Sequence, residues 1–242
     1  MRALFLSFFF ALSLAAQPVT VAVAANVSYA VNDLVQAYEK HYPNDNVRVI
    51  LGSSGKLTAQ IRHGAPYDLF LSADTAFPES LYDKGVGLAP PKVYAKGVLA
   101  LFSRTPRDLS KGLETLLSPD IRRIALANPK TAPYGKAAME ALKKAHLYQT
   151  LRPRFIYGES VSQTLAYALK AADAGLVAKS ALFSPQLYRF QKGRHWVEVD
   201  PSLYAPIAQG ALLLTPMGRD FYEFLFGPEA RAIFQHYGYR LP

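Results

Sequence analysis

Hydroxyl, amide and glycine residues stand together at four points of the chain, each directly before a segment with helical periodicity. The four stretches are AAN at 24–26, GSSG at 52–55, NPKTAPYG at 128–135 and GESVS at 158–162. The first N–H groups of a helix have no intrahelical acceptor, and the helix dipole adds partial positive charge there. Such a point binds an anion without a charged side chain. Asn26 and Ser54 each add a side-chain donor, so the pattern indicates an anion site built from neutral groups.

Helix capping is the simpler explanation for any one of these stretches, because Ser and Asn are preferred residues at the start of a helix. Four such junctions in two regions of sheet favour a shared site only modestly, since every α/β protein must begin its helices somehow. The capping and binding interpretations therefore both stay open at this point.

Enzymatic chemistry finds weaker support in the same residues. GSSGK lacks the four residues that a P-loop places between Gly and Gly-Lys, and Ser54 is not in a G-x-S-x-G motif. Asp68, Asp74 and Glu159 carry acid–base groups, but no spacing connects them. No metal-binding spacing such as HExxH joins the histidines, which are His41, His63, His146, His195 and His236. We therefore expect no catalytic residue, no direct metal ligand and no cofactor.

The composition is that of a globular protein with a basic surface. Of the 242 residues, 50% are hydrophobic and 19% charged, and 27 Lys and Arg outnumber 18 Asp and Glu. A positive surface suits anionic ligands, nucleic acid or acidic membranes, although the cations are spread along the chain and a solvated surface explains them equally well. The aromatic residues of DFYEFLF and FQHYGY have helical spacing, so we expect them in the core and expect no nucleic-acid partner. The absence of cysteine excludes disulfides, thiolate metal sites and cysteine nucleophiles.

The first 16 residues have the form of a secretory signal peptide. MRALFLSFFFALSLAAQ contains one positive residue, Arg2, then an apolar run over 3–14 and small residues around a cleavage point after Ala15 or Ala16. The apolar run is too short for a stable membrane anchor. We therefore predict that residues 1–16 are removed and that the mature protein is periplasmic and soluble.

The rest of the chain alternates strands with helices. Short apolar runs predict strands at 19–25, 47–51, 67–73, 97–103, 123–128, 154–158, 175–180, 195–200 and 207–215. Amphipathic periodicity predicts helices at 27–42, 55–63, 75–84, 133–146, 160–172, 217–226 and 228–237. This alternation is typical of α/β proteins, in which mostly parallel sheets are covered by helices on both faces. Ligands of such sheets bind just beyond the carboxyl ends of the strands.

The chain resembles the periplasmic molybdate-binding proteins that feed an ABC importer, over essentially its whole length after the signal peptide. The segments that carry the resemblance are VAVAANVSYAVNDL, GSSGKLTAQIRHGAPYDLFLSAD, YAKGVLALF, NPKTAPYGKAAMEAL, AGLVAKSAL and GPEARAIFQHYGY. The resemblance implies a type II periplasmic-binding-protein fold, with two α/β lobes, two crossing strands as a hinge, and the oxyanion in the cleft. Lobe 1 would comprise 17–97 and 206–242 and lobe 2 would comprise 98–205, with crossings at GVLALFS and at YAPIA (204–208).

The resemblance also implies which residues hold the ligand. Asn26 would donate its amide and backbone N–H, Ser54 its hydroxyl and N–H, and Val161 its backbone N–H, while Tyr134 occupies the remaining position. One strand departs from its relatives, which often read GIVY with a ligand-binding tyrosine, because this chain reads GLVA with Ala178 in that place. We hypothesise that the hydroxyl of Tyr134 replaces the missing one.

The implied function is high-affinity binding of molybdate, and also of tungstate, by a monomer that delivers the oxyanion to the membrane permease of an ABC importer. Tungstate has nearly the same size and charge as molybdate, so the sequence does not separate the two. Sulfate, phosphate or chromate are alternative ligands, whereas an organic acid is disfavoured because no Arg lies at the four junctions to clamp a carboxylate. A hydrolase with Ser54 as nucleophile and a sensor without a transport role are further alternatives.

Overall fold

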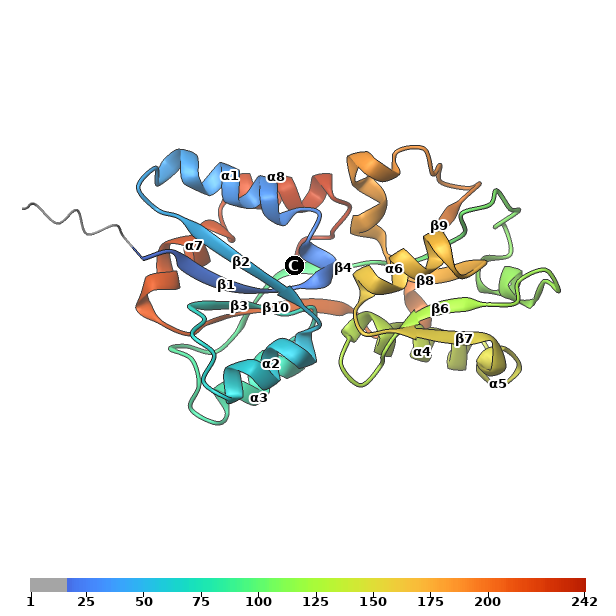
Figure 1. The fold of residues 1–242 in the computed structure, drawn as a ribbon, viewed down its shortest axis with the longest axis horizontal. Helices are drawn as coiled ribbons and strands as arrows, with labels where there is room; N and C mark the ends of the chain where they lie inside the picture. The colour runs from blue at the N-terminus through green and yellow to red at the C-terminus, as the bar shows by residue number, and fades with distance from the viewer. Residues whose placement is uncertain (1–16) are drawn as a thin grey trace, which may run out of the picture.

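The computed structural model describes residues 17–242, which form two α/β lobes lying side by side (Figure 1). Each lobe is built on one five-stranded sheet. The two-lobed α/β architecture expected from the sequence is thereby confirmed, while the predicted signal peptide, residues 1–16, lies outside the described residues. Within residues 17–242, no helix is both long enough and apolar enough to cross a membrane.

The first lobe has a mixed sheet covered on both faces. Its strands are β1 (Val19–Ala24), β2 (Val47–Gly52), β3 (Leu69–Leu71), β4 (Lys92–Gly97) and β10 (Ile207–Leu213), in the spatial order β2-β1-β3-β10-β4. Its helices are α1 (Val31–His41), α2 (Ser54–Arg62), α3 (Ala76–Tyr82), α7 (Arg219–Phe224) and α8 (Pro228–His236), with 3₁₀ turns η1 (Ala25–Val27) and η7 (Pro216–Gly218). β1 pairs in parallel with β2 and β3, and β10 pairs antiparallel with β3 and β4.

The second lobe repeats this plan. Its strands are β5 (Leu99–Phe102), β6 (Ile124–Ala127), β7 (Phe155–Gly158), β8 (Ala174–Ala178) and β9 (Trp196–Glu198), in the spatial order β7-β6-β8-β5-β9. Its helices are α4 (Pro133–Lys144), α5 (Tyr148–Leu151) and α6 (Val161–Lys170), with 3₁₀ turns η2 (Gly112–Leu117), η3 (Arg152–Arg154), η4 (Lys179–Phe183), η5 (Pro185–Leu187) and η6 (Pro201–Leu203). β6 pairs in parallel with β7 and β8, and β5 pairs antiparallel with β8 and β9.

The central strands are apolar except for Thr20 of β1 and Gln209 of β10, because both of their faces are buried. Successive side chains of a strand point to opposite faces, so Val21 and Val23 of β1 join the core formed with α1, α7 and α8, while Ala22 joins the core formed with α2 and α3. In the second lobe, Leu126 of β6 packs with the α4 core and Ala125 with the α6 core. The rigid sheets hold the carboxyl ends of their parallel strands at the edges where the lobes meet.

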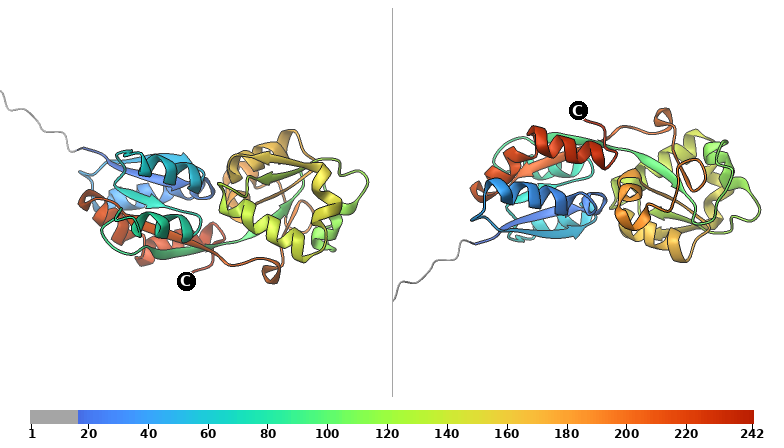
Figure 2. Two further views of the ribbon diagram at one scale, coloured as in Figure 1. Left: turned by 90° about the horizontal axis from the view of Figure 1, so that it is seen from below. Right: turned by 90° about the horizontal axis from the view of Figure 1, so that it is seen from above.

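Two segments connect the lobes on one side of the molecule (Figure 2). Strand β4 ends at Gly97 and β5 begins at Leu99, so Val98 alone makes the first connection. The second runs from the end of β9 to the start of β10 and contains η6. We propose that these connections form the hinge, with 17–97 and 206–242 as one lobe and 98–205 as the other.

Two element predictions from the sequence are wrong in detail. Strand β4 was not expected, because the charged residues Lys92 and Lys96 interrupt its apolar pattern, and the predicted strand 97–103 merged the first crossing with β5. The helix expected over 27–42 begins only at Val31, after the short turn η1. The apolar periodicity continues through both pieces, which hides the break between them.

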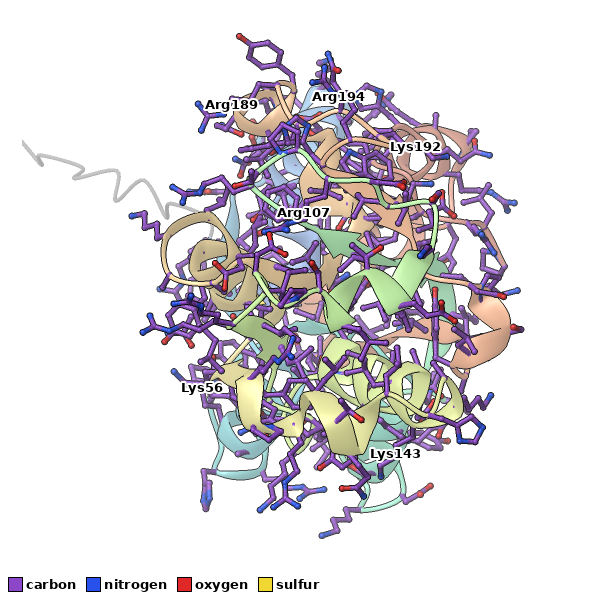
Figure 3. All side chains as sticks on the ribbon, turned by 90° about the vertical axis from the view of Figure 1, so that its right-hand side faces the viewer. Lys56, Arg107, Lys143, Arg189, Lys192 and Arg194 are labelled. Carbon is purple, nitrogen blue, oxygen red and sulfur yellow. The ribbon has the colours of Figure 1, made fainter. Side chains whose placement is uncertain are left out.

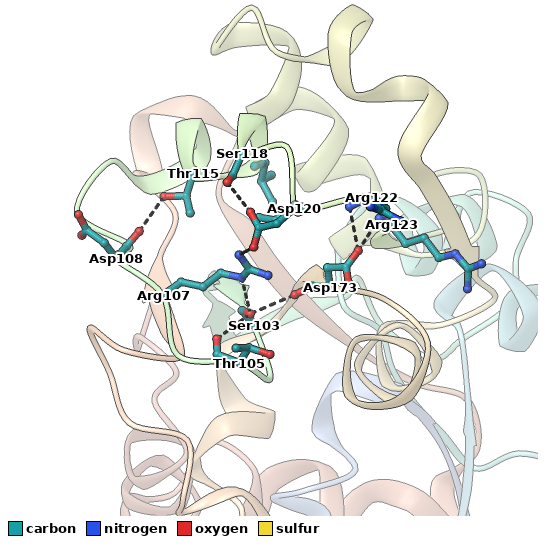
Figure 4. Close-up of polar contacts among 12 residues, drawn as sticks. Ser103, Thr105, Arg107, Asp108, Thr115, Ser118, Asp120, Arg122, Arg123 and Asp173 are labelled. Atoms are coloured by element: carbon teal, nitrogen blue, oxygen red, sulfur yellow. Dashed lines mark hydrogen bonds and ion pairs between the residues drawn. The ribbon is translucent and has the colours of Figure 1, made fainter.

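A polar network fixes the outer end of the second lobe (Figure 4). The Asp173 carboxylate accepts hydrogen bonds from the backbone N–H groups of Arg122 and Arg123 at 2.8 and 2.9 Å, and Arg107 forms an ion pair with Asp120. These contacts lie at the amino ends of β6 and β8. The opposite, carboxyl ends of the parallel strands are left facing the first lobe.

Candidate functional site

A small cavity lies between the lobes, beyond the carboxyl ends of β1, β2, β6 and β7. The structure brings all the ligand-binding residues predicted from the sequence to this cavity: Asn26 and Ser54 from the first lobe, Tyr134 and Val161 from the second. The remaining lining residues are small or uncharged: Ala24, Ala25, Ser53, Ala73, Ala132, Pro133 and Ser160. Among the described residues, no charged side chain lines the cavity.

Unpaired backbone N–H groups are the main feature of the site. Asn26 lies in η1, Ser54 and Val161 are the first residues of α2 and α6, and Tyr134 is the second residue of α4. In these first turns a helix has no carbonyl to receive the N–H groups. Nothing in residues 17–242 accepts a hydrogen bond from any of the four. The cavity is therefore surrounded by donors that need an acceptor.

The residues before these helices explain why the first N–H groups stay free. Ser53 caps α2 and Ser160 caps α6, each accepting at 3.3 Å from the N–H of the residue three positions on. Pro133 begins α4 and has no N–H, so Tyr134 supplies the first donor of that helix. The capping residue satisfies a later N–H group of the helix, and the N–H group of the next residue stays unpaired and available to a ligand.

Two hydroxyl groups add to the donors. Ser54, which is 1% exposed, accepts a hydrogen bond at 3.0 Å from the N–H of Ala73 through its Oγ. Its own hydroxyl hydrogen has no acceptor within the described part of the chain and is free to point into the cavity. Ser160 has the same freedom, since its Oγ only accepts. Ser160 was not predicted as a site residue, although it stands in the GESVS stretch at 158–162.

The Asn26 side chain is turned away from the cavity. Its Nδ2 donates to Oε1 of Gln209 at 2.9 Å and to the hydroxyl of Tyr239 at 3.0 Å, which uses both amide hydrogens. Its Oδ1 is buried and has no hydrogen-bond partner among residues 17–242. The backbone N–H of Asn26 is therefore available to a ligand in this structure, while its amide hydrogens are not.

The Tyr134 hydroxyl is also engaged behind the cavity. It accepts from Nε2 of Gln209 at a long 3.5 Å and packs against Gly97, where a Cβ would come within 2.2 Å of it. Burial raises the pKa of Tyr134 well above its usual value, so the hydroxyl stays neutral. The idea that this hydroxyl replaces the one missing at Ala178 stays a prediction. Gln209 itself was missed, although a lone polar residue in the apolar run IAQGALLLT was a visible signal.

Direct hydrogen bonds cross between the lobes around the cavity. Gly55 N–H donates to the carbonyl of Thr131 at 2.9 Å, and Ser53 Oγ donates to a carboxylate oxygen of Glu159 at 2.5 Å. Two further serines donate across the boundary: Ser162 to the carbonyl of Ala25 at 2.8 Å and Ser180 to the carbonyl of Asn26 at 2.9 Å. Each lobe thus donates hydrogen bonds to acceptors of the other, and these bonds hold the two lobes in a closed arrangement.

The acid–base residues weighed for catalysis have structural roles. Asp68 accepts from the N–H of Thr20 at 2.8 Å and the hydroxyl of Thr215 at 2.6 Å, which ties β3 to its neighbours. Asp74 accepts from the N–H of Phe77 at 3.2 Å, and burial raises the pKa of its carboxyl. No histidine lines the cavity, and the described residues contain no group of three or more metal-ligating side chains. Ser54 therefore has no general base beside it.

The positive charge of the chain is carried elsewhere on the surface. Figure 3 views the outer end of the second lobe, and its labelled cations lie apart from the top to the bottom of the view: Lys56, Arg107, Lys143, Arg189, Lys192 and Arg194. None of them lines the cavity. An anion in this cavity would therefore meet N–H dipoles and no basic side chain.

Comparisons with known proteins identify relatives of this chain. Residues 19–240 match the family model described as bacterial extracellular solute-binding protein. The molybdate-binding protein ModA of Rhodobacter capsulatus is 36% identical over 237 residues, which cover 95% of this chain and 90% of that protein. The ModA of Azotobacter vinelandii is 34% identical, over 93% of this chain and 91% of that protein. The solved structure of an Azotobacter vinelandii periplasmic molybdate-binding protein superposes with a TM-score of 0.84 at 31% identity, covering 93% of this chain and 99% of that chain.

Proposed function

The chain belongs to the bacterial extracellular solute-binding proteins, which are components of transport systems and not enzymes, and on that premise we propose that it binds molybdate in the cavity between its lobes. The bound oxyanion would then be delivered to the membrane permease of an ABC importer. The observation that carries the proposal is the set of unpaired N–H groups of Asn26, Ser54, Tyr134 and Val161 around one uncharged cavity. A fully ionised tetrahedral oxyanion only accepts hydrogen bonds, so it complements this set.

The number of donors is sufficient for tight binding. A hydrogen bond to a charged acceptor contributes about 1.5–3 kcal/mol, and micromolar affinity corresponds to roughly −8 kcal/mol. Four backbone donors together with the hydroxyls of Ser54 and Ser160 reach that range after the cost of ordering the two lobes. Burying an ion without such donors would be strongly unfavourable, so each donor matters.

Closing of the two lobes would signal to the importer that the oxyanion is bound. Asn26 and Ser54 belong to one lobe and Tyr134 and Val161 to the other, so the full donor set exists only when the lobes meet. A ligand that gains contacts only in the closed form shifts the population toward that form, and hinge closure of this kind is a common switching device. A permease that recognises the closed surface would therefore select loaded protein.

Selectivity would come from the size of the donor cage. Close-packed lobes cannot contract to follow the shorter bonds of sulfate without strain, whereas tungstate has nearly the dimensions of molybdate and should bind as well.

We further propose that residues 1–16 direct export to the periplasm and that the protein works there as a monomer.

Calorimetry of the protein lacking residues 1–16 tests the proposed ligand. We expect molybdate and tungstate to bind at micromolar concentration or tighter, and sulfate and phosphate to bind at least about a hundredfold more weakly, which is roughly 2.7 kcal/mol. All four anions are compared at one ionic strength because screening alters anion binding. Absence of heat with both molybdate and tungstate would rule out the proposal.

Val161→Pro removes one of the four backbone donors and little else. Proline is tolerated at the first position of a helix, and Ser160 already has the extended conformation, φ −131° and ψ 167°, that a residue before proline requires. We expect molybdate affinity to fall about ten- to hundredfold, the value of one hydrogen bond to a charged acceptor. Val161→Ala is the matched control, because it trims the same side chain and keeps the N–H. Equal affinities for the two variants would show that this donor does not hold the ligand.

Gly55→Ala tests whether binding requires closure. A Cβ at residue 55 would lie 2.9 Å from Cα and 3.1 Å from the carbonyl oxygen of Thr131, so the lobes would be kept apart. Alanine is otherwise the better helix former by roughly 0.5–1 kcal/mol. We expect a melting temperature at least equal to that of the original protein, weaker molybdate binding, and a larger radius of gyration by small-angle scattering at saturating molybdate. Lys56→Ala, on the exposed side of the same helix, should leave all three unchanged, and an equally compact, tightly binding Gly55→Ala variant would contradict the requirement for closure.

A further inference from the structure

The donor N–H groups around the cavity differ in what holds them in place. A peptide unit is planar and trans, so its N–H and its C=O point in opposite directions, and whatever holds the carbonyl also aims the N–H. In α2 and α6 the helix itself does this. The Ser53 carbonyl accepts from the N–H of Leu57 at 3.0 Å, and the Ser160 carbonyl accepts from the N–H of Thr164 at 3.0 Å. The N–H groups that follow these two carbonyls are therefore aimed by their own helices.

The N–H of Asn26 is held differently. Its peptide unit contains the Ala25 carbonyl, and η1 is only three residues long. The local bond to that carbonyl, from the N–H of Ser28, is a long 3.3 Å and has the poorer geometry of a 3₁₀ turn. The shorter bond comes from the other lobe, since Ser162 Oγ in the first turn of α6 donates to the Ala25 carbonyl at 2.8 Å. The Asn26 N–H is therefore aimed from across the lobe boundary.

The hydrogen bonds around Ser162 are consistent with one another. A serine hydroxyl has one hydrogen and two acceptor positions. Because the Ser162 hydrogen is directed to the Ala25 carbonyl, Ser28 Oγ, which lies 3.4 Å from Ser162 Oγ, is the donor of that hydroxyl pair. A donor on the carbonyl also polarises the peptide unit. Ser162 therefore both aims the Asn26 N–H and makes it a stronger donor.

We propose, resting on the proposed function, that Ser162 is the positioning residue that aims the Asn26 N–H at the oxyanion when the lobes are closed. Ser162 belongs to α6 of the second lobe and Asn26 to η1 of the first, so opening the lobes breaks the bond between Ser162 and Ala25. The peptide unit of Asn26 then keeps only the long bond within η1. Closure thus does more than bring the two halves of the donor set together, because the second lobe also aligns a donor that belongs to the first.

Ser180 makes a bond of the same kind to the next peptide unit and so provides a matched control. Its Oγ donates across the boundary to the Asn26 carbonyl at 2.9 Å, and the Tyr239 hydroxyl donates to the same oxygen at 2.8 Å. That carbonyl belongs to the peptide unit between residues 26 and 27, which does not contain the Asn26 N–H. Removing the Ser180 hydroxyl therefore costs one bond between the lobes without releasing a proposed ligand donor.

Molybdate titration of Ser162→Ala and Ser180→Ala separates positioning from a role in closure alone. Each variant loses one hydrogen bond between neutral groups of the two lobes, worth about two- to tenfold in affinity. Ser162→Ala also releases the peptide unit of Asn26, so we expect its affinity to lie at least about fivefold below that of Ser180→Ala. Any smaller difference would overturn the positioning role and leave the proposed function intact. Failure of the unmodified protein to bind molybdate would overturn both.

The backbone amide resonance of Asn26 supplies a second readout, which weaker closure alone does not move once molybdate is saturating. A hydrogen bond to the oxyanion shifts the amide proton downfield. In loaded Ser162→Ala we expect the Asn26 proton to move back upfield, while the amide protons of Ser54 and Tyr134 keep the positions they have in the loaded original protein. In loaded Ser180→Ala all three should keep those positions. An Asn26 resonance unchanged by Ser162→Ala would refute the role of Ser162.

Discussion

A dianion leaves water only for a site that replaces its hydration with hydrogen bonds, and that constraint organises this molecule. In the site that we propose, the donors are N–H groups which the geometry of a helix leaves without acceptors. Three helices and one 3₁₀ turn begin at the cavity, and each contributes one such group, at Asn26, Ser54, Tyr134 and Val161. Because the donors are parts of the backbone, their positions depend on the sheets from which the helices start. The site is thus as rigid as the two cores beneath it.

The same constraint explains why the site is divided between two lobes. A cage that surrounds an ion must open to admit it, and the hinge that we propose, at Val98 and between β9 and β10, would allow that movement with both sheets intact. The lobes meet through hydrogen bonds of their own, such as Gly55 with Thr131. In the proposed mechanism, closure would be stabilised by protein contacts and by ligand contacts, and the balance between the two would set how strongly a bound ligand favours the closed form.

The sequence was informative about the site because helix starts have a local signature. Small and capping residues before periodic segments singled out the stretches that contain Asn26, Ser54, Tyr134 and Val161, which the structure brings to one cavity, and their role in holding the ligand stays a prediction. The alternation of elements identified the α/β class. Strand β4 was not predicted, because edge strands carry charged residues such as Lys92 that break an apolar run. The contacts of Gln209 were not predicted for a different reason, since its partners Asn26, Tyr94 and Tyr134 are far from it in sequence. Contacts between distant residues, including the direction of the Asn26 amide, follow from tertiary packing and have no local pattern.

The position of the bound oxyanion is the most direct test of this account. Diffraction from crystals grown with molybdate, collected at the molybdenum absorption edge, locates the metal atom independently of any assumed binding mode. The account predicts one strong anomalous peak in the cavity, with molybdate oxygens about 2.7–3.2 Å from the backbone nitrogens of Asn26, Ser54, Tyr134 and Val161 and no lysine or arginine in contact. A peak elsewhere, or an oxyanion held by a basic side chain, would contradict it.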